Sequence, residues 1–501
     1  MSSIDPITLQ VLVGGLRAAC DEMGATLIRS AYSANIKERH DCSTALFDVA
    51  GELVMQAEHI PVHLGSMPDA VAAILGEEQR PGQSWILNDP YRGGTHLPDI
   101  TLISPVFAGQ ELLGFAAGRA HHADVGGPTP GSMPAFSKTL AEEGVVIPPT
   151  AATEETLERL TSQMRMPRQR LADLRAQQAA NRIGELRLGE LRDRLGTGAL
   201  REGMAAILDY TERRTRAALA ELPDGSYEAE DVLDGDWDGQ ERDLRLRLVA
   251  TIEGEALRLD FSGSEDQVDG NLNCPLSVTK SAAFFAVRVL TDPEAPPSAG
   301  AHRPIEVVAP PGSLLSARFP AAVAAGNVET SSRVADLVLA ALSQARPGPA
   351  QGQGTMNNLS LAGADFTYYE TLGGGQGACP EADGPSAIHV AMSNTLNTPV
   401  EALETEFPLR VRELSLRRGS GGDGARRGGD GIVRGIEALA PMRFSLITER
   451  RRHAPQGQGG GEDGAVGRNF LNGEELASKA GGGMAPGDHL RIETPGGGGH
   501  S

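Results

Sequence analysis

Glycine runs fill the last third of this sequence and limit the structures that it can adopt. The chain has 62 glycines in 501 residues, and they concentrate after Gly373, with runs at 419–422 and 496–499. Disorder is the simplest interpretation of such a composition. Strand-like segments such as 431–434 and 444–447 lie between the runs, however. We therefore expect an ordered β-rich region in which glycine-rich turns connect the strands.

Hydrophobic periodicity predicts the secondary structure before this region. Asp5 and Pro6 form a typical N-cap and first-turn pair, and apolar residues then recur at helical spacing from Ile7 to Cys20. The other predicted elements are a hairpin over 43–55, strands over 84–87, 100–107 and 112–118, two or three helices over 153–222, antiparallel strands over 244–249 and 257–261, and helices over 279–290 and 331–344.

These patterns predict a multidomain α+β fold in three parts. The first is a mixed α/β N-terminal region over residues 1–150, and the second is a helical segment over 151–222. The third is a β-rich, glycine-heavy C-terminal region with helices over 223–501.

Charge and cysteine usage limit the class of protein. The formal net charge of -21 repels a phosphate backbone, so we expect no nucleic-acid partner and no anionic membrane surface. No stretch stays apolar long enough to cross a bilayer, and the first thirty residues do not resemble a signal peptide. The four cysteines are scattered singly, which argues against disulfides and a thiolate zinc site and favours the cytoplasm.

Two neighbouring segments hold the densest group of chemically active side chains. They are residues 88–99 (NDPYRGGTHLPD) and 118–124 (GRAHHAD), and they contain three of the 11 histidines. Because Pro98 forbids regular helix, His96 and Asp99 can converge on one ion. Adjacent strand residues face opposite ways, so only one of His121 and His122 can join them. The alternative is that these histidines are hydrogen-bonded surface residues.

Three further segments leave alternatives open. Asp41, in the charged stretch 38–43, is either a ligand or base, or a capping carboxylate at a helix-to-strand junction. His59 and His63 are interpreted as loop-packing residues. None of the four lysines follows a glycine, so the sequence has no GxxxxGK[ST] phosphate loop, and it has no Gly-x-Ser-x-Gly motif.

The sequence resembles the hydantoinase B, 5-oxoprolinase and acetone carboxylase alpha-subunit family from end to end. The matching stretches are 60–67 (IPVHLGSM), 88–99, 119–127, 130–134 (PGSMP), 270–275 (GNLNCP), 325–331 (AGNVETS), 394–401 (NTLNTPVE) and 493–499 (ETPGGGG). The stretch 450–457 (RRRHAPQG) keeps the arginines and the proline–glycine spacing of the family, with substitutions between them.

The resemblance implies a divalent metal held by Asp41, His96, Asp99 and His121. Zinc, manganese and iron all suit imidazole and carboxylate ligands. The metal part of such enzymes opens a cyclic amide, a hydantoin or 5-oxoproline, that a hydantoinase A-type partner has activated with ATP and Mg²⁺. His122 and Asp124 are the candidates for proton transfer or for orienting the ligands.

The resemblance therefore predicts a hetero-oligomeric, ATP-dependent amidohydrolase. An alpha-type subunit of an ATP-dependent ketone carboxylase, which would use the same site, is the alternative. A noncatalytic scaffold is a third possibility, which the presence of His96, Asp99 and His121 argues against.

Overall fold

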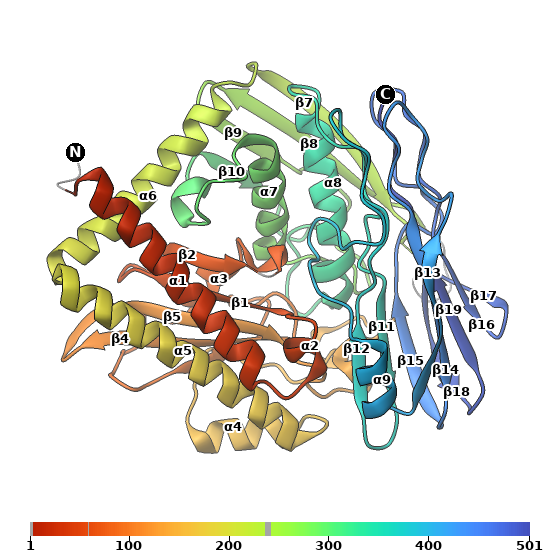
Figure 1. Cartoon of the computed structure of the whole chain (residues 1–501), viewed down its shortest axis with the longest axis horizontal. Helices are drawn as coiled ribbons and strands as arrows, with labels where there is room; N and C mark the ends of the chain where they lie inside the picture. Colours follow the sequence, from red (N-terminus) through yellow and green to blue (C-terminus); the bar gives the residue numbers. More distant parts are fainter. Residues whose placement is uncertain (1–3, 59, 236–241) are drawn as a thin grey trace.

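A computed structural model describes residues 4–58, 60–235 and 242–501 of the chain (Figure 1). Strands and helices are both abundant, and the α+β class predicted from the sequence is confirmed. Among the described residues, no helix is both long enough and apolar enough to cross a membrane.

A six-stranded antiparallel sheet forms the centre of the N-terminal part, with strand order β2-β1-β5-β4-β3-β6. Its strands are β1 (Cys42–Phe47), β2 (Leu53–Glu58), β3 (Trp85–Leu87), β4 (Asp99–Ala108), β5 (Glu111–His121) and β6 (Thr150–Ala151). The predicted hairpin and the three predicted strands are therefore present. Apolar side chains alternate between the two faces, so each face needs its own cover.

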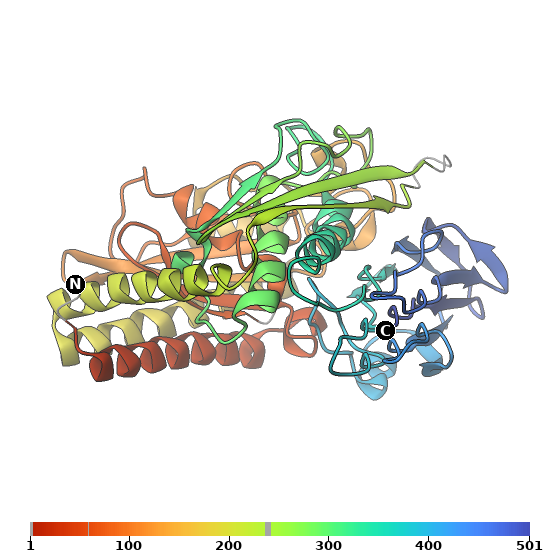
Figure 2. The ribbon, with the colours of Figure 1, turned by 90° about the horizontal axis from the view of Figure 1, so that it is seen from above.

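Long helices cover one face of this sheet (Figures 1 and 2). They are α1 (Pro6–Ser30), α5 (Pro167–Leu195) and α6 (Thr197–Leu219), and the short α4 (Glu154–Thr161) precedes α5. Asp5 caps α1 by accepting from the backbone N–H groups of Ile7 and Thr8, as the sequence predicts. The breaks before α5 and α6 fall at Met166 and Gly196, both with positive φ.

Helix α3 (Met67–Ala72) covers part of the opposite face. The other short elements are α2 (Ala34–Lys37), whose Ile36 packs with α1, the 3₁₀ turns Pro61–His63 and Pro130–Ser132, and the 3₁₀ turn Leu140–Glu142, whose Leu140 packs with α4 and α5. Met67, Ala70 and Val71 pack against Phe47 and Phe115 of the sheet.

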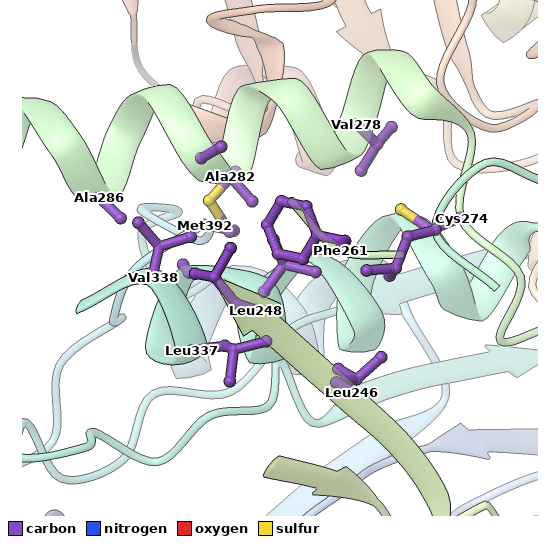
Figure 3. Close-up of a cluster of buried hydrophobic side chains, with 14 of the residues drawn as sticks. Leu246, Leu248, Phe261, Cys274, Val278, Ala282, Ala286, Leu337, Val338 and Met392 are labelled. Atoms are coloured by element: carbon purple, nitrogen blue, oxygen red, sulfur yellow. The ribbon is translucent and has the colours of Figure 1, made fainter. Parts of the chain in front are cut away.

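The central part is a second sheet with strand order β10-β9-β8-β7, packed against two helices. Its elements are β7 (Gly225–Leu233), β8 (Leu244–Glu253), β9 (Ala256–Asp260), β10 (Ile305–Val308), α7 (Leu276–Thr291) and α8 (Ser331–Leu342), with a 3₁₀ turn at Ala299–His302 and a π-helical turn at Gly326–Thr330. Figure 3 shows their apolar core, in which Leu248 meets Val338, Phe261 and Met392.

Two antiparallel sheets build the C-terminal part, which lies beside the other two (Figure 2). Their orders are β12-β11-β15-β18 and β13-β14-β19-β16-β17. The elements are β11 (Asn358–Ala362), β12 (Thr367–Glu370), α9 (Val400–Glu406), β13 (Leu409–Arg417), β14 (Gly431–Ala438), β15 (Met442–Ile447), β16 (Arg468–Leu471), β17 (Glu474–Leu476), β18 (Lys479–Met484) and β19 (His489–Glu493). Residues of both sheets share one apolar cluster.

The glycine runs are ordered, but most of them are not turns. Extended segments near residues 375, 422, 429, 462 and 497 exchange backbone hydrogen bonds, such as Gly497 N–H to the oxygen of Gly429. A Cβ at Gly497 would overlap the carbonyl of Gln376. Backbones can approach this closely only where no side chain intervenes, as in the collagen triple helix. Close packing, and not chain reversal, therefore explains most of these glycines.

Candidate metal centre

Strand register sets three of the predicted ligands in one row. Asp99 at the start of β4 lies directly opposite His121 at the end of β5. His121 N–H donates to the backbone oxygen of Asp41, which stands immediately before β1. Directly opposed residues of neighbouring strands project from the same face. Asp41, His121 and Asp99 therefore lie side by side at one end of the sheet.

His96 completes the group from the loop before β4. Its Nδ1 lies 3.0 Å from Asp99 Oδ2, and His121 Nδ1 lies 3.4 Å from Asp99 Oδ1. The two imidazole rings are 5.0 Å apart between centroids. His96, Asp99 and His121 are all buried, and each offers a ligand atom within 4.8 Å of the others. The structure thus brings together the three residues that the sequence grouped.

Unpaired ring nitrogens show that this group fits a metal ion. Both nitrogens of His96 and the Nε2 atoms of His121 and His63 are buried and make no hydrogen bond of acceptable geometry, although His96 Nδ1 and His63 Nε2 lie close to Asp99. A buried polar atom without a partner costs about 1–3 kcal/mol. Several such nitrogens around one carboxylate are the donor set that a divalent cation requires. His96, Asp99 and His121 could therefore hold a metal.

The pKa shifts in this cluster favour the protonation states that bind a cation, which are a charged carboxylate and a neutral imidazole. Burial alone would raise the pKa of Asp99, but His96 and His63 hold the pKa of this carboxyl well below its usual value. Burial lowers the pKa of His63, which favours the neutral imidazole that a metal needs. Burial raises the pKa of Asp41 to about 6, while His121 opposes this rise.

His63 belongs to the same group, although the sequence suggested only loop packing. Its Nε2 lies 3.4 Å from Asp99 Oδ2, and its Nδ1 lies 2.9 Å from Ser43 Oγ. The only sequence signal was its position in the stretch 60–67 that carries the family resemblance. His59, interpreted in the same way, lies outside the described residues.

Arg119 holds the loops that carry these histidines. It lies two residues before His121 on β5 and is fully buried. Its guanidinium donates to Thr101 on β4, to Ser66 Oγ and to the oxygen of Gly93. One side chain therefore fastens the loop after His63 and the loop before His96 to the sheet.

Tyr369 of β12, in the C-terminal part, contacts the cluster of His96, Asp99 and His121. Its ring stacks on His121 with centroids 4.5 Å apart and an angle of 10°. Its hydroxyl donates to Asn358 Oδ1 at 2.7 Å, and Asn358 Nδ2 donates to Glu329 at 2.7 Å. Glu329 lies in the π-helical turn before α8, and burial raises its pKa to about 8. This chain of contacts fixes the ring of Tyr369 and, through it, the imidazole of His121.

A cavity of about 70 Å³ lies beside Tyr369, which forms part of its wall. Its walls include Asn35 of α2, Arg170 of α5, Tyr368 of β12 and Phe407 after α9. Tyr369 therefore both stacks on His121 and borders this cavity.

His122 and Asp124 point to other partners. His122 Nε2 lies 2.9 Å from Gln177 Oε1 of α5, so its ring faces the helices that cover the sheet. Asp124 accepts from the N–H groups of Gly126 and Gly131 and pairs with Arg165 at 3.0 Å. In the part of the chain that the structure describes, no hydrogen bond joins His122 to Asp124. The sequence rule that only one of the paired histidines can share the ion agrees with this arrangement.

Comparison with known proteins decides the family. Residues 5–501 match the Hydantoinase B/oxoprolinase family. The chain belongs to this family. The family resemblance proposed from the sequence is therefore confirmed.

Relatives of the Hydantoinase B/oxoprolinase family cover nearly the whole chain. A 5-oxoprolinase of Dictyostelium discoideum is 38% identical over 99% of this chain and 40% of its own length. A putative D-/L-hydantoinase subunit of Pseudomonas sp. (strain NS671) is 33% identical over 93% of this chain and 84% of its own length. The chain thus spans about two fifths of the length of the 5-oxoprolinases that it matches.

Two solved structures share the fold. The crystal structure of an ATP-dependent caprolactamase from Pseudomonas jessenii matches with a TM-score of 0.92 and 28% identity, over 99% of this chain and 91% of that one. A nucleotide-free acetone carboxylase matches with a TM-score of 0.88 at 18% identity, over 99% and 76%. The second match shows a common fold only.

Proposed function

We propose that this chain supplies the ring-opening site of an ATP-dependent cyclic-amide hydrolase of the hydantoinase or 5-oxoprolinase type. The convergence of buried, unpaired imidazole nitrogens on Asp99 carries the proposal. The family relatives support it, since their names describe hydrolases of cyclic amides.

His96, Asp99 and His121 would hold the metal, with Asp41 as the fourth ligand. Nitrogen and oxygen donors of this kind suit zinc, manganese or iron. When bound, such an ion supplies a Lewis acid and lowers the pKa of a coordinated water.

The remaining residues orient this site. Tyr369 and Arg119 hold the ligands in place, and His63 contributes a neutral imidazole beside Asp99. The sequence allowed two roles for His122 and Asp124, which were proton transfer and orientation of the ligands. We assign both residues to orientation. His122 anchors the end of β5 to Gln177, and Asp124 holds the loop that follows.

ATP would be handled by a hydantoinase A-type partner. An amide resists hydrolysis because the nitrogen lone pair is delocalised into the carbonyl group. Phosphorylation of the amide oxygen removes this protection. Addition of water then breaks the C–N bond and opens the ring, and a second water releases the phosphoryl group as inorganic phosphate. The 5-oxoprolinases that are more than twice as long, and the relative named as a hydantoinase subunit, support a division of labour between two parts.

Co-expression with the partner tests the proposal. We expect the complex to consume ATP only when a cyclic amide such as 5-oxoproline or a hydantoin is present, and to release the opened product. ATP consumption and product are measured together, with and without bicarbonate. ATP use that depends on a ketone and incorporates bicarbonate would instead establish the carboxylase alternative.

Asp41 should matter for activity far more than for folding. Asp41→Asn removes the negative charge that a cation or a proton needs, but keeps the size and hydrogen-bonding capacity of the side chain. We expect turnover with partner and ATP to fall at least about 100-fold, with an unchanged Tm.

Asp48→Asn is the matched control for this substitution. Asp48 accepts from the N–H groups of Ala50 and Glu52 in the β1–β2 turn, which is the capping role that the sequence also allowed for Asp41. Asn serves that role nearly as well, so activity should stay near wild type. Full activity in both variants would return Asp41 to a structural role.

A further inference from the structure

Arg39 is a fully buried arginine whose hydrogen bonding is incomplete. Its Nη2 donates to Thr371 O at 3.2 Å, to Thr371 Oγ1 at 2.6 Å and to Thr395 Oγ1 at 2.8 Å. Its Nε and Nη1 are buried and have no partner. The guanidinium is therefore held firmly through one nitrogen while its two other nitrogens remain free to donate.

The positive charge of Arg39 is not matched by an ion pair. Among the described residues, no carboxylate oxygen lies within 4.0 Å of its nitrogens. The threonine oxygens that it contacts are neutral. His389, hydrogen-bonded to Thr395, is neutral as well, because burial and the charge of Arg39 lower its pKa to about 3.

Several other buried arginines of this chain have such pairs, and Arg119, which has none in the part of the chain that the structure describes, uses all three of its nitrogens as hydrogen-bond donors. Arg434 lies 3.3 Å from Glu370, and Arg450 lies 2.9 Å from Asp336. A buried charge with unused donors is strongly unfavourable, so Arg39, which lacks both an ion pair and full hydrogen bonding, calls for a counterion from outside the chain.

The position of Arg39 places this counterion beside the metal cluster. Arg39 follows α2 and stands two residues before Asp41, and Thr371 follows β12, which carries Tyr369 (Figure 1). Its charge acts on both Asp41 and Tyr369. Asp41 cannot serve fully as its counterion if its charge also balances a bound cation.

We infer that Arg39 forms an oxyanion subsite beside the metal cluster that holds the phosphoryl group of the ATP-activated substrate. The inference rests on the proposed function. It extends that function by naming a residue that recognises the activated form of the substrate and not the cyclic amide itself.

Two features favour a phosphoryl group over other ligands. The guanidinium offers several N–H donors in a rigid plane, which matches phosphate and carboxylate oxygens. In a substrate phosphorylated on its amide oxygen, that oxygen is bonded to the carbon under attack. The phosphoryl group must therefore lie close to the ligands of the ion, as Arg39 does. A carboxylate on the substrate ring is the competing source of the same chemistry.

Calorimetric titration of the metal-loaded chain with inorganic phosphate tests the inference. We expect Arg39→Met to weaken phosphate binding at least about tenfold, and Arg39→Lys to weaken it less, because lysine keeps the charge but loses the planar donors. Metal content should stay at the wild-type level in both variants. Arg434→Lys, in a buried arginine that has its own carboxylate, should bind phosphate like wild type.

A parallel titration with 5-oxoproline distinguishes the two sources. A loss of affinity for 5-oxoproline equal to or greater than the loss for phosphate overturns the phosphoryl assignment in favour of a carboxylate site. Unchanged phosphate affinity in folded Arg39→Lys and Arg39→Met also overturns it. If Arg39→Met does not fold, Arg39→Lys alone decides. Neither titration needs ATP, partner or turnover, so failure of the proposed function is recognised separately.

Discussion

We expect the purified chain to carry a divalent metal, and His96→Ala, Asp99→Ala and His121→Ala each to remove most of it. Each substitution deletes one of the three side chains whose ligand atoms lie within 4.8 Å of one another. An ion that loses one of three or four protein ligands loses at least about 100-fold in affinity, since even outer contacts are worth about 10- to 100-fold. Elemental analysis after dialysis measures the result directly.

His453→Ala is the matched control for these variants. His453 Nε2 lies 2.9 Å from Asp243 Oδ1, so it forms a histidine–aspartate pair away from the cluster. Its removal should leave the metal content unchanged. Circular dichroism and Tm establish that each variant is folded. Near-full occupancy in all three folded ligand variants would refute the metal assignment.

Replacing Gly497 by alanine should destabilise the C-terminal part severely. The new Cβ would overlap the backbone of Gln376 and Gly377, and backbone atoms cannot rotate away as a flexible side chain does. The segments that cross at this point also exchange hydrogen bonds, including Gly497 N–H to Gly429 and Gly422 N–H to Gly497. We expect a loss of about 3 kcal/mol or more in the free energy of unfolding.

Gly483→Ala provides the comparison within the same part of the chain. Gly483 lies on β18 and is exposed, and a Cβ there meets nothing within 4 Å. Its replacement should change the free energy of unfolding by less than about 0.5 kcal/mol. Urea unfolding followed by circular dichroism measures both variants. Similar stability of the two variants would show that the glycine segments tolerate side chains and are not packed backbone to backbone.

Local signals in the sequence were sufficient for most of the secondary structure. The cap at Asp5 and the hydrophobic periodicity over 244–249 depend on neighbouring residues only, and they predicted α1 and β8, which the structure contains. The same holds for His96, Asp99 and His121. The proline between the first two and the alternation of strand side chains are local constraints, so the group could be proposed before its geometry was known.

Contacts between distant segments were decided by the tertiary structure alone. His63, Tyr369 and Arg39 carry no local pattern that separates them from packing residues. They reach the cluster because β1, β5 and β4 pair in register and because β12, far beyond Asp99 in the sequence, is brought against His121. The same is true of the glycine runs. Composition alone showed that these segments lack side chains, but only the tertiary structure shows that neighbouring backbones fill the space where side chains would lie. A short-range pattern records what a residue requires of its neighbours in sequence, whereas its partners across the fold depend on the summed packing of all elements.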